Sequence, residues 1–176
     1  ISSSVSGRVK KIYAAAGEPV DDVMYEHGAL MLVSLDGYMA VDIDTAALSV
    51  GDSMTVSTSD GTEYTGTVGA VLDGTATVLI TDNGPAYGDA VSVKSADGAD
   101  LGSGELYIHD ELKIVGYAGT VSYLSVSEGS SIYSGSTLLG LTDTAYTANY
   151  ETLLSERSDK EAVLNRLIKI YKEGAL

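Results

Sequence analysis

The sequence predicts a mainly β protein: a small antiparallel β-barrel, two β half-motifs on either side of it, and a C-terminal amphipathic helix. Three observations support this fold class. Apolar and polar residues alternate in short runs, turn-forming dipeptides separate those runs, and one segment of the chain recurs later in the sequence. Only the last part of the chain follows a helical period.

Composition limits both the size of the fold and the classes of function. The 176 residues suffice to bury a core in one large domain or in two to three small ones. The formal net charge of -15 argues against nucleic acid as a partner, because phosphate binding needs clustered basic residues. With no cysteine the chain has neither disulfides nor thiolate zinc ligands. Since Phe and Trp are absent, 12 tyrosines supply all the aromatic packing.

Residues 38–108 show the clearest strand pattern and are predicted to form the barrel. Alternation is evident in Met54-Thr-Val56-Ser and in Ala76-Thr-Val78-Leu-Ile80. Dipeptides that favour positive φ separate these runs, and such dipeptides are typical of tight hairpin turns. They are Asp36-Gly37, Asp60-Gly61, Asp73-Gly74, Asn83-Gly84 and Asp97-Gly98. We expect hairpins to turn at Asp60-Gly61 and at Asp73-Gly74.

The internal repeat is the most informative feature of the sequence. Gly7-Arg-Val9-Lys-Lys-Ile12, followed by Gly17 and Val20, matches Gly119-Thr-Val121-Ser-Tyr-Leu124, followed by Gly129 and Ile132. The next apolar runs, from Gly28 and from Gly135, match only after five extra residues in the first copy. Each copy predicts a strand, a turn that requires glycine and a second strand. Gly17 and Gly129 are therefore expected in equivalent turns.

Residues 145–176 are predicted to form a projecting amphipathic helix. Its apolar positions recur at steps of three and four: Tyr146, Tyr150, Leu153, Leu164, Leu167 and Tyr171. One continuous helix is the preferred interpretation, and a break at Ser158-Asp-Lys-Glu161, which has the spacing of a capping box, is the alternative. The seam formed by Tyr150, Leu153, Leu164, Leu167 and Tyr171 is expected to pack against a partner helix.

The repeated segments resemble the half-motifs of biotinyl/lipoyl-type domains, in which two similar β units interlock about a pseudo-twofold axis. The second copy, followed at once by a helix, resembles the arrangement in HlyD-like membrane-fusion (periplasmic adaptor) proteins. Four parts are then expected: half-motif 1 at residues 1–37, the barrel at 38–108, half-motif 2 at 109–144 and the helix at 145–176, as one half of a helical hairpin.

The order of these parts departs from that of the family. The usual order runs half-motif, hairpin, half-motif, barrel, whereas here the barrel follows the first half-motif and the helix follows the second. Two interpretations remain open. The copies pair with each other, or each pairs with a half-motif that lies outside the sequence.

Side chains that could carry chemistry are few. A lipoyl or biotin carrier needs a lysine at a turn tip, but the tips are Ser34-Leu35-Asp36-Gly37 and Leu141-Thr142-Asp143. Lys10 and Lys11 are expected to be solvated charges on a strand. His27, placed in a loop, and His109, at a strand end, lack the spacing of a metal pair. Neither the acidic residues Asp42, Asp44, Asp97 and Asp100 nor any glycine-rich segment fits a calcium or phosphate loop. We expect no catalytic, cofactor or metal site.

The resemblance implies a non-enzymatic adaptor that links an efflux or secretion transporter, of the ABC or resistance-nodulation-division type, to other envelope components. It also implies other adaptor subunits as partners, a homo-oligomer in the assembled complex, and an extracytoplasmic location. The membrane would be reached only through a segment outside this sequence. The alternative is a cell-surface carbohydrate-binding or adhesive module, which exposed coplanar tyrosines on one barrel face would favour.

Overall fold

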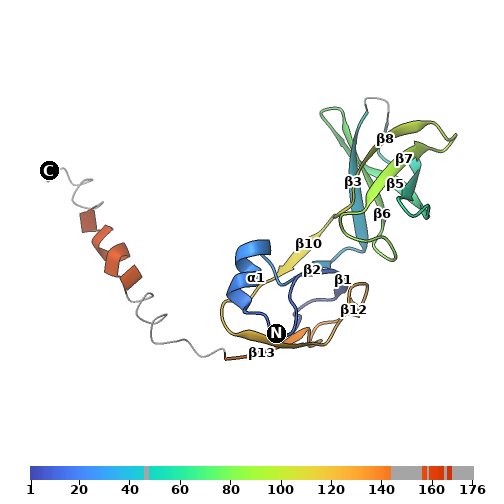
Figure 1. Ribbon diagram of the computed structural model, residues 1–176. Helices are drawn as coiled ribbons and strands as arrows, with labels where there is room; N and C mark the ends of the chain where they lie inside the picture. Colours follow the sequence, from blue (N-terminus) through green and yellow to red (C-terminus); the bar gives the residue numbers. More distant parts are fainter. Residues whose placement is uncertain (46–47, 144–155, 158, 165, 168–176) are drawn as a thin grey trace. The chain divides into compact units, whose positions relative to one another are not determined.

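The computed structural model describes residues 1–45, 48–143, 156–157, 159–164 and 166–167. Two compact units make up the chain, Ile1–Thr142 and Asp143–Leu176. The described residues of Ile1–Thr142 form thirteen strands, arranged in three sheets, and the short helix α1 (Figure 1). The mainly β fold class with a barrel-like sheet is thereby confirmed.

The barrel is a nearly closed antiparallel sheet of seven strands in the order β8-β7-β4-β5-β6-β3-β9. Its apolar side chains alternate along the strands and fill one core, so the period-two pattern reports the inward face. The strands are β3 (Tyr38–Asp44), β4 (Ser53–Thr58), β5 (Glu63–Leu72), β6 (Thr75–Thr81), β7 (Ala90–Ser95), β8 (Asp100–Glu105) and β9 (Tyr107–Ile108).

Turn chemistry determines where the barrel hairpins reverse. Strands β4 and β5 pair across a turn at Asp60-Gly61, and β5 and β6 pair across Asp73-Gly74. Gly61, Asp73 and Gly74 all have positive φ. Both hairpins expected from the sequence are therefore confirmed. Glycine also brings the barrel towards closure, because a Cβ on Gly104 of β8 would meet Val41 of β3.

The two copies of the repeat pair with each other. We call residues 1–36 and 110–142 the repeat module. It contains a four-stranded sheet, in the order β10-β2-β1-β12, and a two-stranded sheet of β11 and β13. Its elements are β1 (Gly7–Ile12), α1 (Val20–His27), β2 (Met31–Ser34), β10 (Glu111–Ile114), β11 (Thr120–Leu124), β12 (Ser131–Ile132) and β13 (Leu139–Thr142).

Pseudo-twofold symmetry relates the copies down to single hydrogen bonds. Strand β1 pairs with β2 through a bulge after Val9, and β11 pairs with β13 through a bulge after Val121. These positions are equivalent in the repeat. The alternative in which each copy needs a half-motif outside the sequence is not required by the fold.

The first copy differs from the second by one insertion. The sequence predicts a second strand after Gly17, but only Pro19 makes an extended bridge, to Thr120, before α1 begins. Pairing of Met31 and Leu139 at equivalent positions gives the first copy four extra residues, so the expected five is wrong. Helix α1 accommodates these residues and is capped at its C-terminus by Gly28, whose φ is 70°.

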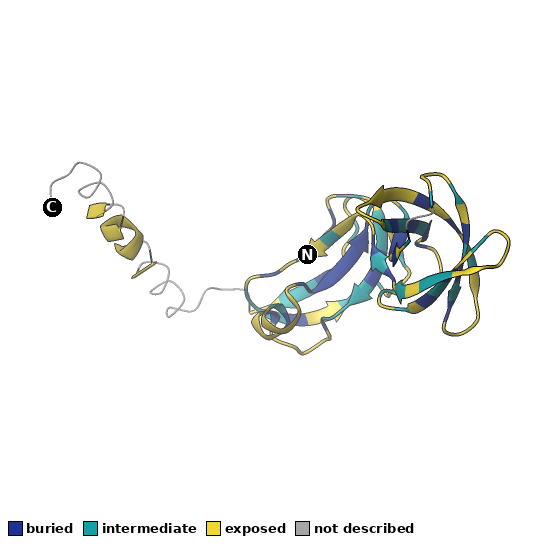
Figure 2. Ribbon diagram, turned by 90° about the horizontal axis from the view of Figure 1, so that it is seen from above, coloured by how far each residue is buried: buried dark blue, intermediate teal, exposed yellow. Residues whose placement is uncertain are grey.

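Strand β2 separates two cores and belongs to both. All four of its residues are buried. Leu32 packs in the barrel cluster, whereas Met31 and Val33 pack in the cluster of the repeat module. A strand covered on both faces needs apolar residues at successive positions, which explains the continuous run from Ala29 to Val33. Figure 2 shows buried residues on the strands of both the barrel and the repeat module.

Residues Asp143–Leu176 form the second unit, which we call the helical unit. Its residues 156–157, 159–164 and 166–167 are helical, whereas Asp143 is not. Arg157 Nε lies 2.9 Å from Glu161 Oε1, an ion pair one turn apart. Among the described residues, no helix combines the length and the apolar character needed to cross a bilayer.

Candidate interaction surfaces

Each of the two turn tips of the repeat module connects it to the next part of the chain, and neither carries a reactive group. At the first tip, Asp36 Oδ1 accepts the backbone N–H of Tyr38 at 3.0 Å, and Asp36 Oδ2 lies 2.6 Å from His109 Nδ1. The chain enters the barrel here and returns beside the same point, since Leu35 N–H donates to the Asp110 carbonyl at 3.0 Å. The second tip, Thr142 and Asp143, precedes the helical unit.

Lys10 is buried, contrary to the expectation of a solvated strand charge. Only 5 % of its surface is exposed, and its ammonium donates to the carbonyl oxygens of Asp82 at 2.6 Å and Pro85 at 2.5 Å. Burial lowers the pKa of Lys10, and the charge of Asp82 opposes that shift. The sequence could not show this, because the covering residues belong to a barrel loop more than seventy positions away.

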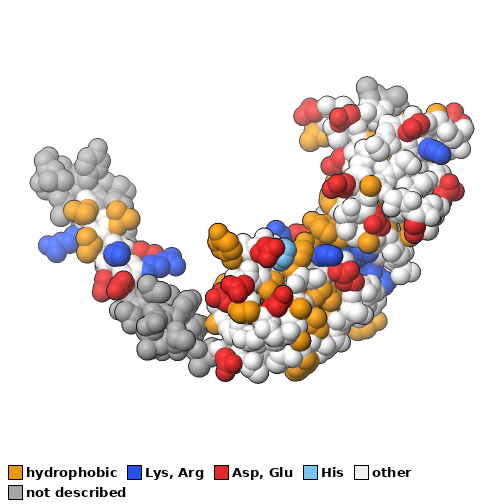
Figure 3. Space-filling model, viewed as in Figure 1, with side chains coloured by type: hydrophobic (Ala, Val, Ile, Leu, Met, Phe, Trp, Pro, Cys, Tyr) orange, Lys and Arg blue, Asp and Glu red, His pale blue; other side chains and the backbone are white. Residues whose placement is uncertain are grey.

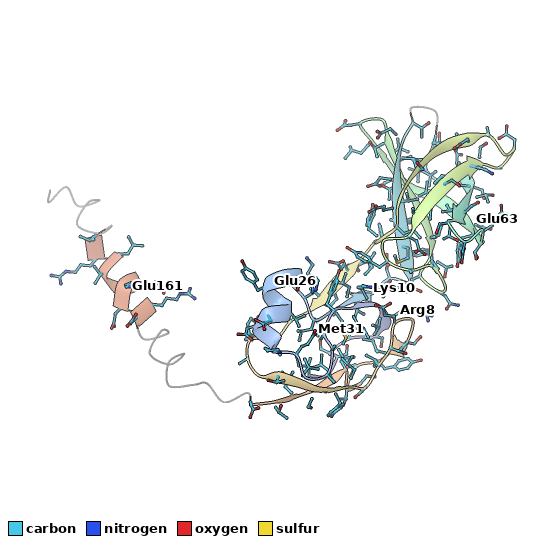
Figure 4. All side chains as sticks on the ribbon, viewed as in Figure 1. Arg8, Lys10, Glu26, Met31, Glu63 and Glu161 are labelled. Atoms are coloured by element: carbon cyan, nitrogen blue, oxygen red, sulfur yellow. The ribbon has the colours of Figure 1, made fainter. Side chains whose placement is uncertain are left out.

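Arg8 completes the contact between the repeat module and the barrel. Arg8 Nε lies 3.0 Å from Asp82 Oδ1, and Arg8 Nη1 donates to the Gly129 carbonyl at 2.8 Å. Arg8 and Lys10, both labelled in Figure 4, lie on β1, next to the barrel. Lys11 behaves as expected: its side chain is 40 % exposed and pairs with Glu128 at 3.4 Å. We call Arg8, Lys10 and Asp82 the junction.

The histidines serve local packing and pairing. His27 is the last residue of α1 and not part of a loop, and its ring stacks on Tyr13 with centroids 4.3 Å apart. Burial raises the pKa of Tyr13. His109 follows β9 and pairs with Asp36, which lies two residues after β2, so its predicted place at a strand end is confirmed.

The acidic residues considered for calcium accept hydrogen bonds from neighbouring groups. Asp42 Oδ1 accepts the hydroxyls of Thr77 at 2.7 Å and Tyr107 at 3.1 Å, and Asp44 Oδ1 accepts that of Thr75 at 3.0 Å. Burial, followed by the bond to Asp42, raises the pKa of Tyr107. No group of three or more metal-ligating side chains occurs in the part of the chain that the structure describes.

The tyrosines that the structure describes all lie in the first unit, either in the barrel or in the repeat module. In the barrel, Tyr64 and Tyr87 pack against the core. The repeat module exposes the larger fractions, and these residues are Tyr25 at 96 %, Tyr117 at 77 %, Tyr133 at 67 % and Tyr123 at 52 %. Tyr38, at the start of β3, is 47 % exposed. Acidic side chains are spread over the face of this unit shown in Figure 3, with fewer basic ones.

Two of the predicted seam residues can be placed. Leu164 and Leu167 lie in the helical unit with 56 % and 53 % of their surface exposed, and Val163, just before Leu164, is 59 % exposed. Tyr150, Leu153 and Tyr171 lie outside the described residues. The helix therefore presents apolar side chains that nothing in its described part covers.

Gly17 and Gly129 lie in turns with φ values of 93° and 86°. Each donates its backbone N–H across the module, Gly17 to Val121 at 2.8 Å and Gly129 to Val9 at 2.7 Å. Compared with protein-family models, with curated proteins and with solved structures, the chain has no match.

Proposed function

We propose that the chain is a non-enzymatic adaptor that joins a membrane transporter to other components of a cell envelope. The observation that supports this proposal is the use of the two tips of the repeat module. One tip carries the barrel and the other leads to the helical unit, whereas a carrier domain would present a lysine there. The likeness to HlyD-like membrane-fusion proteins, and with it the extracytoplasmic location and the homo-oligomer, rests on this arrangement.

Exposed apolar side chains supply the surfaces that an adaptor needs. Leu164 and Leu167 are more than half exposed, and burying a leucine fully is worth roughly 1.5 to 3 kcal/mol. Contact with a second helix, from another adaptor subunit or from the transporter, would recover that free energy. The junction also supports this role. It holds the barrel against the repeat module, and a protein that links two components needs such fixed contacts between its own parts.

The barrel tyrosines do not favour the carbohydrate-binding alternative. Such a module would present flat rings side by side on one exposed barrel face. Tyr64 and Tyr87 instead pack against the barrel core, and the Tyr107 hydroxyl donates to Asp42. The one stacked ring pair among the described residues, Tyr13 with His27, lies outside the barrel.

Site-specific photo-crosslinking in cells that produce the full-length protein tests the proposal. A photoreactive residue replaces Leu164 or Leu167, and Ala162, which is exposed on the opposite side of the helix, serves as the matched control. We expect adducts with a transporter subunit or a second copy from the leucine positions and far fewer from Ala162. Equal adducts from all three positions, together with specific retention of the protein on a glycan array, would contradict the adaptor function.

A further inference from the structure

The two halves of the repeat module differ in how their equivalent strands are paired. Strand β2 has a neighbour on each side, β1 and β10. Its equivalent, β13, has β11 on one side, and on the other side no strand pairs with it among the described residues. β13 consists of Leu139, Gly140, Leu141 and Thr142, and it has neither the charges nor the proline that protect exposed strand edges.

Ile1 lies beside the unpaired edge of β13. Its amino group donates to the Leu139 carbonyl at 2.7 Å, and its carbonyl accepts the N–H of Leu138 at 2.9 Å. Ile114 makes the corresponding contact in the other half, where its carbonyl accepts the N–H of Leu30 at 2.7 Å. Ile1 therefore occupies the position equivalent to Ile114, the last residue of β10. A residue joined to the nitrogen of Ile1 would continue along the free edge of β13.

We propose that the free edge of β13 is a binding site for one further antiparallel strand, formed by polypeptide joined to the nitrogen of Ile1. The register follows from the symmetry. Glu111, Leu112 and Lys113 of β10 lie opposite Ser34, Val33 and Leu32 of β2. The three residues ahead of Ile1 accordingly lie opposite Thr142, Leu141 and Gly140. This inference depends on the repeat alone and not on the proposed function.

The chemistry of the entering strand also follows from β10. Leu112 is half-buried and packs against the repeat-module core, whereas Glu111 and Lys113 are exposed at every second position. Leu141, the equivalent of Val33, packs against the same core. The entering strand thus needs an apolar residue opposite Leu141, with polar residues before and after it.

Three variants with short leaders test the proposal. Because β10 reads Glu-Leu-Lys-Ile, a Glu-Leu-Lys leader ahead of Ile1 reproduces its sequence in the expected register. A Gly-Ser-Gly leader controls for length, and a Glu-Asp-Lys leader removes the apolar residue. Amide exchange followed by NMR reports on β13, and the edge strand β8 of the barrel serves as an internal reference.

We expect the Glu-Leu-Lys leader to slow exchange in Gly140–Thr142 by about tenfold or more, without changing β8. It should also raise the midpoint of thermal unfolding relative to the other two leaders. Equal exchange with all three leaders would overturn the proposal. So would protection of β13 that appears without a leader and grows with protein concentration, because a second copy would then occupy the edge.

Discussion

The backbone N–H of Gly17 lies 2.8 Å from the carbonyl oxygen of Val121, in the other copy of the repeat. Its counterpart joins Gly129 to Val9 at 2.7 Å. Two further bonds follow the same symmetry, from Val121 N–H to Glu18 and from Val9 N–H to Ser130, both at 2.9 Å. Each copy thus supplies the hydrogen-bond partners that the other copy needs, so neither is expected to fold alone.

Replacing Gly17 or Gly129 by alanine should destabilise the protein to a similar extent, by about 1 to 2 kcal/mol. A Cβ at either position meets nothing within 4 Å, so the cost comes from positive φ and not from a clash. Urea unfolding measures it. Gly17→Asn, which tolerates positive φ better, should lose less stability than Gly17→Ala. A loss confined to one of the two glycines would contradict their equivalence.

Lys10→Met should destabilise the protein by about 1 to 3 kcal/mol, because it leaves the buried carbonyl groups of Asp82 and Pro85 without a donor. Lys11→Met is the matched control. That exposed lysine makes only a surface ion pair, and its loss should change the unfolding free energy by less than about 0.5 kcal/mol. If Lys10→Met also cost less than about 0.5 kcal/mol, the buried lysine would not contribute to stability.

Gly140→Ala should disturb the pairing of β11 with β13, because a Cβ there would meet the Tyr123 ring on the opposite strand. We expect a loss of about 1 to 3 kcal/mol. In a Tyr123→Ala background the same substitution should cost less, and a double-mutant cycle measures the difference. Additive effects of the two substitutions would mean that the ring does not cover Gly140.

Asp60 should make stability depend on pH. Its carboxylate accepts the Thr58 hydroxyl at 2.6 Å and the Thr62 N–H at 2.9 Å, and these bonds lower the pKa of Asp60 from its ordinary value. A depressed folded-state pKa contributes stability above the unfolded pKa and loses it as the pH falls through the folded value. The advantage over Asp60→Asn in urea unfolding should therefore shrink below about pH 4. A constant difference down to pH 2 would contradict this assignment.

Local signals predicted the places where the backbone has little choice. Asp60-Gly61 and Asp73-Gly74 turn as hairpins because positive φ is costly for most residues and available to Asp and Gly. The repeated pattern predicted equivalent strands for a similar reason, because a β-bulge and a glycine turn each require particular residues at fixed positions. Helix α1 escaped prediction because its eight residues carry no strong helical period and because the second copy has a turn at the corresponding place.

The sequence alone determined the β class, the hairpin turns of the barrel and the existence of two equivalent half-motifs, because these depend on local φ preferences and on alternation. Tertiary structure decided that the copies pair with each other and that β2 is covered on both faces. It also decided the fate of Lys10: alternation turns its side chain away from Val9, and a distant barrel loop covers that face. Which surface a remote segment covers is set by packing across the whole chain, and no local pattern records it.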